Sequence, residues 1–178
     1  MTTVIHLEDR PAGRRGFEIV LPSVTTGGAA AIVEGVIDAA TPGPPLHVHT
    51  ASDETYFVLS GSLMMHIDGR VITLTAGGLA HVSRGTAHTW ATPLTEGARF
   101  LTLHLPGGYE EYHPTALRAE EEKGRPLEQY DLFKLAARFD WQMAGPEPRR
   151  LTPDGILVPA ARADEEAARA LAALAPVE

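Results

Sequence analysis

The sequence predicts an all-β fold, a sandwich or barrel of short strands, followed by a helical C-terminal appendage. Up to about residue 110 the chain consists of short apolar runs separated by glycine, proline or Asp-Gly turns. Beyond Tyr109 the apolar residues follow helical spacing instead. A chain of 178 residues is long enough to bury one substantial core. We therefore expect a single domain: a β-barrel with an N-terminal arm at residues 1–110, and a helical extension packed on it at residues 111–178.

The strand candidates are rich in valine, isoleucine, threonine and aromatic residues. In chain order they are FEIVLPS, AAIVEGVID, ETYFVLSG, SLMMHIDG, RVITLTAGG, LAHVSRG, AHTWAT and RFLTLHLPGG. Short strands with such frequent turns are typical of sandwiches and barrels. The clearest hairpin is MMHIDGRVITL, because Asp68-Gly69 suits a tight turn with positive φ between two alternating strands.

The segment after Tyr109 predicts helices joined by a connector. HPTALRAEEEKGRPLEQYDLFKLAARFDW has helical spacing, with an apolar stripe drawn from Leu127, Tyr130, Leu132 or Phe133, and Leu135. PEPRRLTPDGILVP is interpreted as a proline-rich connector. ADEEAARALAAL predicts a closing helix with Asp164 as its N-cap and Glu165-Glu166 in its first turn.

Composition and charge exclude several classes of partner. The formal net charge is −8, and basic residues cluster only in short pairs such as Arg14-Arg15 and Arg149-Arg150. Nucleic-acid binding needs basic residues gathered on one surface, and an acidic surface disfavours anionic membranes, so we expect neither partner. The chain has no cysteine, which excludes disulfides, thiolate metal sites and a cysteine nucleophile. No secretory signal or bilayer-length apolar run is visible, and the expected location is cytoplasmic.

Two histidines one residue apart stand in the run PPLHVHTASDETYFVLSG. Alternate residues of a strand point to one face, so His47 and His49 would aim both imidazoles the same way. A solvated strand with two surface histidines is the other interpretation of this pattern. Glu54 opens the next strand candidate, and His88 follows at the far side of the hairpin. Three imidazoles and one carboxylate suit one divalent transition metal (Fe, Mn, Co, Ni, Cu or Zn) and leave positions open for substrate.

These residues resemble the two sequence motifs of the cupin superfamily. The matching residues are His47, His49, Glu54 and Gly61 in the first motif and Gly77, Gly85 and His88 in the second. Thr41, Ser83 and Thr92 stand where the motifs have glycine, proline and asparagine, which are turn and framing positions rather than ligands. The resemblance covers roughly residues 28–105. It implies a cupin double-stranded β-helix, a jelly-roll barrel, with one metal per chain; a metal-free cupin with a histidine cluster is the alternative.

Within the cupins, the run PPLHVHTASDETYFVLSG, the later LPGGYEEY and, more weakly, LAARFDWQMAGP resemble quercetin 2,3-dioxygenase-type proteins. That resemblance implies an oxygenase that cleaves a flavonol or another enediol-type substrate with O₂, with Glu54 as metal ligand and catalytic general base. The alternatives are a non-catalytic small-molecule-binding cupin and a metal-dependent isomerase or decarboxylase. Cupins of this kind often pair through terminal segments, so we expect a homodimer.

Substrate-binding walls are expected among apolar and aromatic residues of the barrel, each of which has ordinary barrel core as its alternative interpretation. The candidates are Tyr56, Met65, Trp90, Phe100 and His104. His66 is expected to be a solvated strand residue, and His81 to be exposed or hydrogen-bonded near the site. His6 and His113 are expected to be peripheral.

Overall fold

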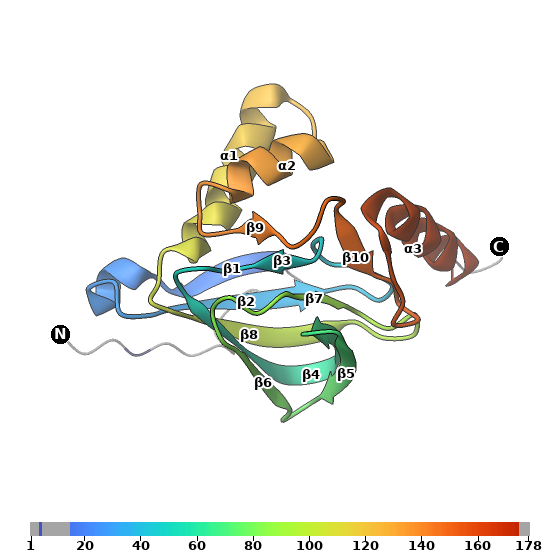
Figure 1. Cartoon of the computed structure of the whole chain (residues 1–178), viewed down its shortest axis with the longest axis horizontal. Helices are drawn as coiled ribbons and strands as arrows, with labels where there is room; N and C mark the ends of the chain where they lie inside the picture. Colours follow the sequence, from blue (N-terminus) through green and yellow to red (C-terminus); the bar gives the residue numbers. More distant parts are fainter. Residues whose placement is uncertain (1–3, 5–14, 175–178) are drawn as a thin grey trace.

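Antiparallel strands form the body of the molecule in the computed structural model, which describes residue 4 and residues 15–174 (Figure 1). The barrel strands are β1 (Gly16–Leu21), β2 (Ala31–Ile37), β3 (His47–Val48), β4 (Asp53–Ile67), β5 (Arg70–Thr75), β6 (Leu79–Val82), β7 (His88–Ala91) and β8 (Ala98–Leu105). A 3₁₀ turn, η2 (Ser23–Thr26), lies between β1 and β2. The expected all-β jelly roll is confirmed.

Strand β4 joins the two halves of the barrel. Its residues 53–61 pair with β8 and β6, and its residues 62–67 pair with β5 and β7. The sequence predicts two strands here, because Gly61 interrupts the apolar pattern. The structure has one strand instead, with a register shift between Val58 and Ser60 against β8. Gly61 has φ 72°, and a Cβ there would collide with the carbonyl oxygen of Gly97, so glycine serves a close backbone approach rather than a chain reversal.

The hairpin predicted at Asp68-Gly69 is confirmed. Ile67 pairs with Arg70 across the turn, and both turn residues have positive φ, 47° at Asp68 and 79° at Gly69. Positive φ at both central positions matches the right-handed twist of the flanking strands, which is why this dipeptide fixes the register of β4 against β5.

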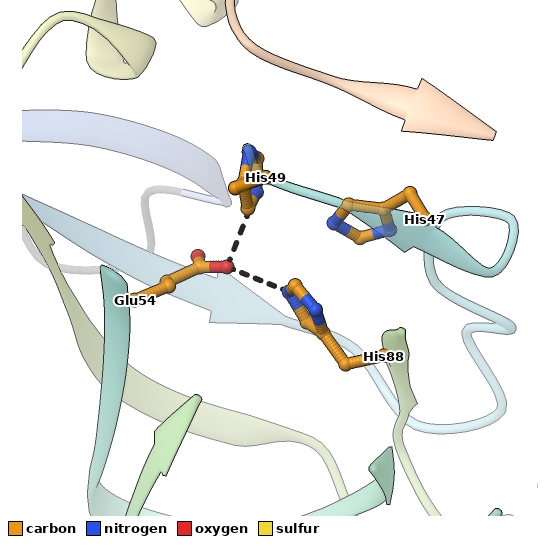
Figure 2. A group of neighbouring side chains, drawn as sticks. All are labelled: His47, His49, Glu54 and His88. Atoms are coloured by element: carbon orange, nitrogen blue, oxygen red, sulfur yellow. Dashed lines mark hydrogen bonds and ion pairs between the residues drawn. The ribbon is translucent and has the colours of Figure 1, made fainter. Parts of the chain in front are cut away.

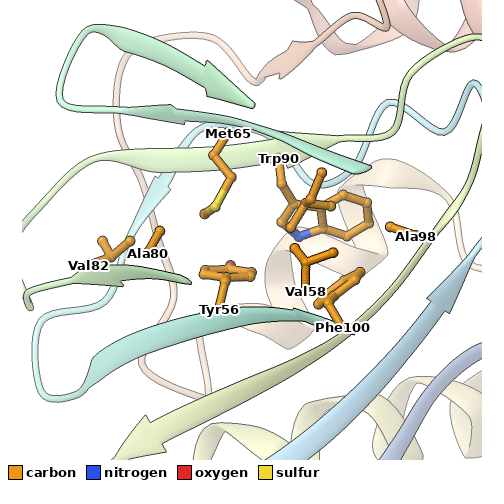
Figure 3. Close-up of a cluster of buried hydrophobic side chains, with 9 residues drawn as sticks. Tyr56, Val58, Met65, Ala80, Val82, Trp90, Ala98 and Phe100 are labelled. Atoms are coloured by element: carbon orange, nitrogen blue, oxygen red, sulfur yellow. The ribbon is translucent and has the colours of Figure 1, made fainter. Parts of the chain in front are cut away.

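The barrel core is an aromatic and aliphatic cluster drawn from both halves of the barrel (Figure 3). Tyr56 and Val58 come from the first half of β4, Leu63 and Met65 from the second half, and Phe100 from β8; all are 0–2% exposed. Trp90 of β7 meets Phe100 edge-on at 5.7 Å between ring centroids. Ring pairs in this geometry add packing energy beyond the area that they bury.

The C-terminal extension contains short strands as well as helices. Its elements are η3 (Tyr109–Glu111), α1 (Tyr112–Lys123), α2 (Gln129–Ala136), β9 (Gln142–Met143), β10 (Arg149–Leu151), β11 (Leu157–Pro159) and α3 (Ala160–Leu174). Gly124 ends α1 in the left-handed conformation, and α2 begins after the Arg125-Pro126 break. Figure 1 shows α1 and α2 together above the barrel and α3 apart from them, with β9 running beside β3.

Two expectations for this extension are wrong. The proline-rich connector forms the β10–β11 hairpin, because Thr152 closes a turn around Gly155 and Ile156. Asp164 does not cap α3, which already begins at Ala160 directly after the hairpin. Its carboxylate instead lies 2.6 Å from Nη1 of Arg150 on β10. Among the helices that the structure describes, none is both long enough and apolar enough to cross a membrane.

Candidate metal centre and cavity

The four predicted ligands lie together in the barrel. His47 on β3 pairs directly with His88 on β7, His49 follows β3, and Glu54 projects from the start of β4 (Figure 2). All four are 1–5% exposed, and one ligand atom from each lies within 4.8 Å of the others. The solvated-strand interpretation of the His47 and His49 pair is therefore wrong.

Backbone carbonyl groups hold the three imidazoles. Nδ1 of His47 is 2.8 Å from the Pro45 oxygen, and Nδ1 of His88 is 3.0 Å from the Thr86 oxygen. Nδ1 of His49 is 2.5 Å from the carbonyl oxygen of Asp140. A carbonyl oxygen only accepts, so each Nδ1 carries its proton and donates. Neutral rings then present bare Nε2 lone pairs, which is the tautomer that a metal ligand needs.

The carboxylate of Glu54 faces those lone pairs. Its Oε2 lies 2.9 Å from Nε2 of His88 and 3.4 Å from Nε2 of His49 (Figure 2). Two acceptors this close repel each other unless a proton or a metal cation stabilises them. The buried Nε2 of His49 has no hydrogen-bond partner among the described residues. The donor set and its orientation therefore fit a divalent metal, because one cation would satisfy atoms that the protein leaves unpaired.

Electrostatics in the cluster favour an ionised Glu54 carboxylate and a neutral His47 imidazole. Burial alone would lower the pKa of His49, but Glu54 outweighs it and raises that pKa above its ordinary value. Burial alone would raise the pKa of Glu54, but His104, His49 and His88 outweigh it and hold the pKa well below its usual range. Burial, reinforced by His88 and His49, lowers the pKa of His47 well below its ordinary value. A deprotonated carboxylate and a neutral imidazole are the forms that bind metal.

Asp140, in the C-terminal extension, holds residues 50–52, the ligand loop between His49 and Glu54. Its carboxylate accepts hydrogen bonds from the backbone N–H groups of Thr50, Ala51 and Ser52 and from the hydroxyls of Thr50 and Ser52, at 2.8–3.0 Å. Asp140 has φ 57°, a conformation that aspartate tolerates better than most residues. Sequence reasoning missed this residue, since no local pattern marks a contact across 90 positions.

A cavity of about 350 Å³ opens beside the ligand cluster. Among the residues that line it are His47 and Glu54 of the ligand set and the predicted wall residues Tyr56, Trp90 and His104. His104 is 1% exposed, and its Nε2 lies 3.6 Å from Oε1 of Glu54. The cavity thus places the carboxylate at the boundary between the imidazoles and a space lined largely by aromatic rings.

Two predicted wall residues do not line this cavity. Met65 and Phe100 have 0% exposure and pack inside the barrel core (Figure 3). Phe100 lies behind Tyr56 and Trp90, with ring centroids 6.1 and 5.7 Å away. Strand parity indicates which residues face the barrel interior, but it does not separate core from cavity wall.

The outer part of the cavity comes from the C-terminal extension, which sequence reasoning did not assign to the site. Tyr109, Tyr112, His113, Phe133, Trp141 and Arg150 all line it. The Trp141 ring stacks between those of His47 and Phe133, at 5.3 and 5.5 Å between centroids. An apolar stripe at helical spacing was the only sequence signal, and it marks α2 as amphipathic without saying what its apolar face covers.

The remaining histidines differ in their surroundings. His113 is not peripheral: its ring stacks on Phe17 at 4.3 Å between centroids, and burial lowers its pKa to about 4. His66 is half-buried rather than solvated, because β7 pairs alongside it. His81 is exposed, with Nδ1 2.9 Å from the Thr55 hydroxyl. His6 lies outside the described residues.

Comparison with known proteins finds a family model that matches part of the chain and several similar solved structures. Residues 34–104 match the family model described as Cupin domain. No curated protein matches the sequence. Similar solved structures include KdgF from Halomonas sp., at 16% identity over 60% of this chain and 96% of that one, with a TM-score of 0.49. A cupin protein from Bacteroides fragilis is 19% identical over 60% of this chain and 88% of that one, with a TM-score of 0.48. An uncharacterised conserved protein with a double-stranded β-helix domain from Klebsiella pneumoniae is 22% identical over 60% and 92%, also at 0.48.

Proposed function

We propose that the protein is a metal-dependent cupin oxygenase, which cleaves a flavonol or a smaller enediol-type substrate with O₂. The observation that carries the proposal is the double position of Glu54, whose carboxylate belongs to the ligand cluster and also lines the cavity. A group in that position can act on a substrate that lies against the metal. His47, His49, Glu54 and His88 would hold the ion.

The ion, when bound, supplies a Lewis acid that stabilises the enolate oxygen of the substrate. Glu54 accepts the proton of the enediol hydroxyl at a carboxylate oxygen, which the surrounding histidines keep ionised. His104 and His49 flank this carboxylate, with Nε2 atoms 3.6 and 3.4 Å away, so they limit its rotation. The base is thereby oriented before substrate arrives.

The cavity walls favour a planar, largely apolar substrate. Trp90, Trp141 and Phe133 offer ring faces and edges, and the volume of about 350 Å³ lies at the small end of ligand sites. Burial raises the pKa values of Tyr56 and Tyr109 well above the usual phenol range, so both stay neutral. Of the carboxylates and phenols lining the cavity, Glu54 is therefore the one that is anionic at neutral pH.

The test combines metal analysis with an oxygen-electrode screen, on protein made without a histidine tag. We expect close to one divalent transition metal per chain, and metal-dependent O₂ consumption with at least one flavonol or smaller enediol. Protein that binds no metal, or that consumes no O₂ with any of these compounds, would contradict the proposal.

A non-catalytic binding cupin is the second candidate, favoured by the aromatic cavity itself, which suits binding of a small apolar molecule. A protein that binds an enediol in the same screen and never consumes O₂ would support it. A metal-dependent isomerase or decarboxylase would instead change the substrate without O₂, and product analysis under nitrogen would show it.

The homodimer and the cytoplasmic location stay predictions. Light scattering at micromolar concentration tests the first, and a monomeric mass would contradict it. Fractionation of the cells that produce the protein tests the second.

A further inference from the structure

Arg150 gives the cavity a fixed positive charge. Its side chain lines the cavity from β10, on the side formed by the C-terminal extension. No other lysine or arginine is among the described residues that line this cavity. Apart from the Glu54 carboxylate, Thr41 and Thr102, the remaining wall is aromatic, aliphatic or imidazole, and the chain as a whole carries a net charge of −8. A cation that faces a largely apolar space indicates that the cavity binds an anionic group.

The guanidinium has one hydrogen-bond partner among the described residues, and most of its five N–H donors are left over. Its Nη1 lies 2.6 Å from the carboxylate of Asp164 on α3. Its Nε is buried and has no hydrogen-bond partner among the described residues. Nε–H can only donate, and buried donors are nearly always paired. The guanidinium therefore has donors left for an acceptor that the described residues do not supply.

We propose that Arg150 binds the carboxylate of the substrate, and that the substrate class is a small aromatic carboxylic acid. This proposal rests on the proposed function, because the same molecule would present its enediol oxygen to the metal cluster while its acid group meets the guanidinium. A carboxylate is the acceptor that matches a guanidinium best, since two parallel N–H donors can engage its two oxygens. The planar ring of such an acid suits the aromatic walls around Trp141 and Phe133.

Arg149 provides a matched control within the same strand. It is exposed and precedes Arg150 on β10, where side chains alternate between faces. A substitution there removes the same charge from the protein without touching the cavity. Asp164→Asn is a second control, because it removes the ion pair and leaves the guanidinium in place.

The test compares benzoate with its neutral isostere benzamide on the whole protein, by isothermal titration calorimetry. Both tryptophans of the chain line the cavity, so their fluorescence reports occupancy independently. We expect benzoate to bind at least about tenfold more tightly than benzamide, since charge-assisted hydrogen bonds are about twice as strong as neutral ones. Arg150→Gln should abolish this preference, whereas Arg149→Gln and Asp164→Asn should keep it.

Removing the metal tests whether Arg150 or the metal ion binds the carboxylate of benzoate. The preference for benzoate should survive dialysis against a chelator if Arg150 provides it. A preference that disappears with the metal and survives Arg150→Gln would overturn the proposal, as would equal binding of benzoate and benzamide by the wild type. The wild-type comparison decides the question even if Arg150→Gln does not fold.

The outcome is also distinguishable from that of the proposed function. A protein that prefers benzoate through Arg150 but consumes no O₂ with any enediol would support the anion site and contradict the oxygenase. Metal-dependent O₂ consumption with no benzoate preference would do the reverse.

Discussion

The barrel and the C-terminal extension contribute differently to the same site. The barrel supplies the four candidate ligands within a short span of chain, from His47 to His88, at positions set by strand pairing. The extension supplies no candidate ligand, but it contributes much of the cavity wall and the Asp140 contacts that hold the ligand loop. The difference teaches that the ligand cluster depends on local sequence, whereas the shape of the cavity depends on a segment that folds over it.

The two regions also differ in packing. The barrel core consists of fully buried side chains from several strands. Helix α1 buries none of its residues completely, and α2 buries only Leu135 and Ala136 among those described. Regions with fewer buried apolar contacts open at lower free energy than the core. We therefore expect the extension to be the less stable region, and the following changes test that division.

The largest effect is expected in the barrel. Glu54→Gln should lower the rate of substrate turnover about 10²–10⁴-fold at full metal occupancy, because an amide cannot accept the enediol proton. The measurement is O₂ consumption by protein whose metal content has been determined. His88→Ala is the control, since it perturbs the metal without removing the proposed base, and excess metal should restore part of its activity. If metal-loaded Glu54→Gln turned over substrate at the wild-type rate, Glu54 would not be the general base.

His113 connects the two regions, and its contribution to the free energy of unfolding depends on pH. Burial and the nearby His104 lower the pKa of His113 from 6.5 to about 4 in the folded chain. Between these values the unfolded chain binds a proton that the folded chain does not, so the free energy of unfolding decreases as the pH falls from 6.5 to 4. His113→Phe keeps a ring against Phe17 and lacks the titrating group.

The difference between wild type and His113→Phe should grow to at most about 3 kcal/mol over this pH range. Urea unfolding of the metal-free proteins at a series of pH values measures it. If the free energies of unfolding of wild type and His113→Phe changed with pH in parallel, His113 would be protonated equally in the folded and unfolded chains.

Asp140 tests whether the extension acts on the ligands. Asp140→Gly accommodates the positive φ and removes the carboxylate, so three backbone N–H groups of the ligand loop lose their acceptor. Metal affinity should fall about 10- to 100-fold, as is usual when a residue that orients ligands is lost. Competition with a chromogenic chelator measures it. Asp140→Asn keeps one acceptor oxygen, so its metal affinity should fall less. Unchanged metal affinity in Asp140→Gly would show that the contact does not act on the ligands.

The sequence predicted the ligand set because its geometry is local. Alternation along a strand puts His47 and His49 on one side, and β7, which carries His88, pairs with both β3 and β4. The same reasoning failed at Gly61, since a glycine that permits close approach and a glycine that turns the chain look alike in a sequence.

The rest of the site depends on contacts between distant segments. Asp140 meets residues 50–52, and Arg150 reaches the cavity from a hairpin that the sequence presents as a proline-rich connector. Hydrophobic spacing predicts that α2 has an apolar face but not which surface that face covers. Met65 and Trp90 pair across β4 and β7, yet only Trp90 meets the cavity. No pattern in the barrel sequence indicates that distinction.

The smallest expected effect measures the stability difference between the two regions directly. Trp90 lies on β7 of the barrel and Trp141 in the extension, and they are the two tryptophans of the chain. In Trp141→Phe the remaining tryptophan, Trp90, reports on the barrel by its fluorescence. In Trp90→Phe the remaining tryptophan, Trp141, reports on the extension. If the extension opens about 1 kcal/mol before the barrel, its fluorescence midpoint should precede the β-sheet circular dichroism midpoint of the same variant by about 0.5 M urea. In Trp141→Phe the two midpoints should coincide, because Trp90 packs within the barrel core. Coincident midpoints in both variants would mean that the extension unfolds together with the barrel, and that the cavity wall is as stable as the ligand cluster that it covers.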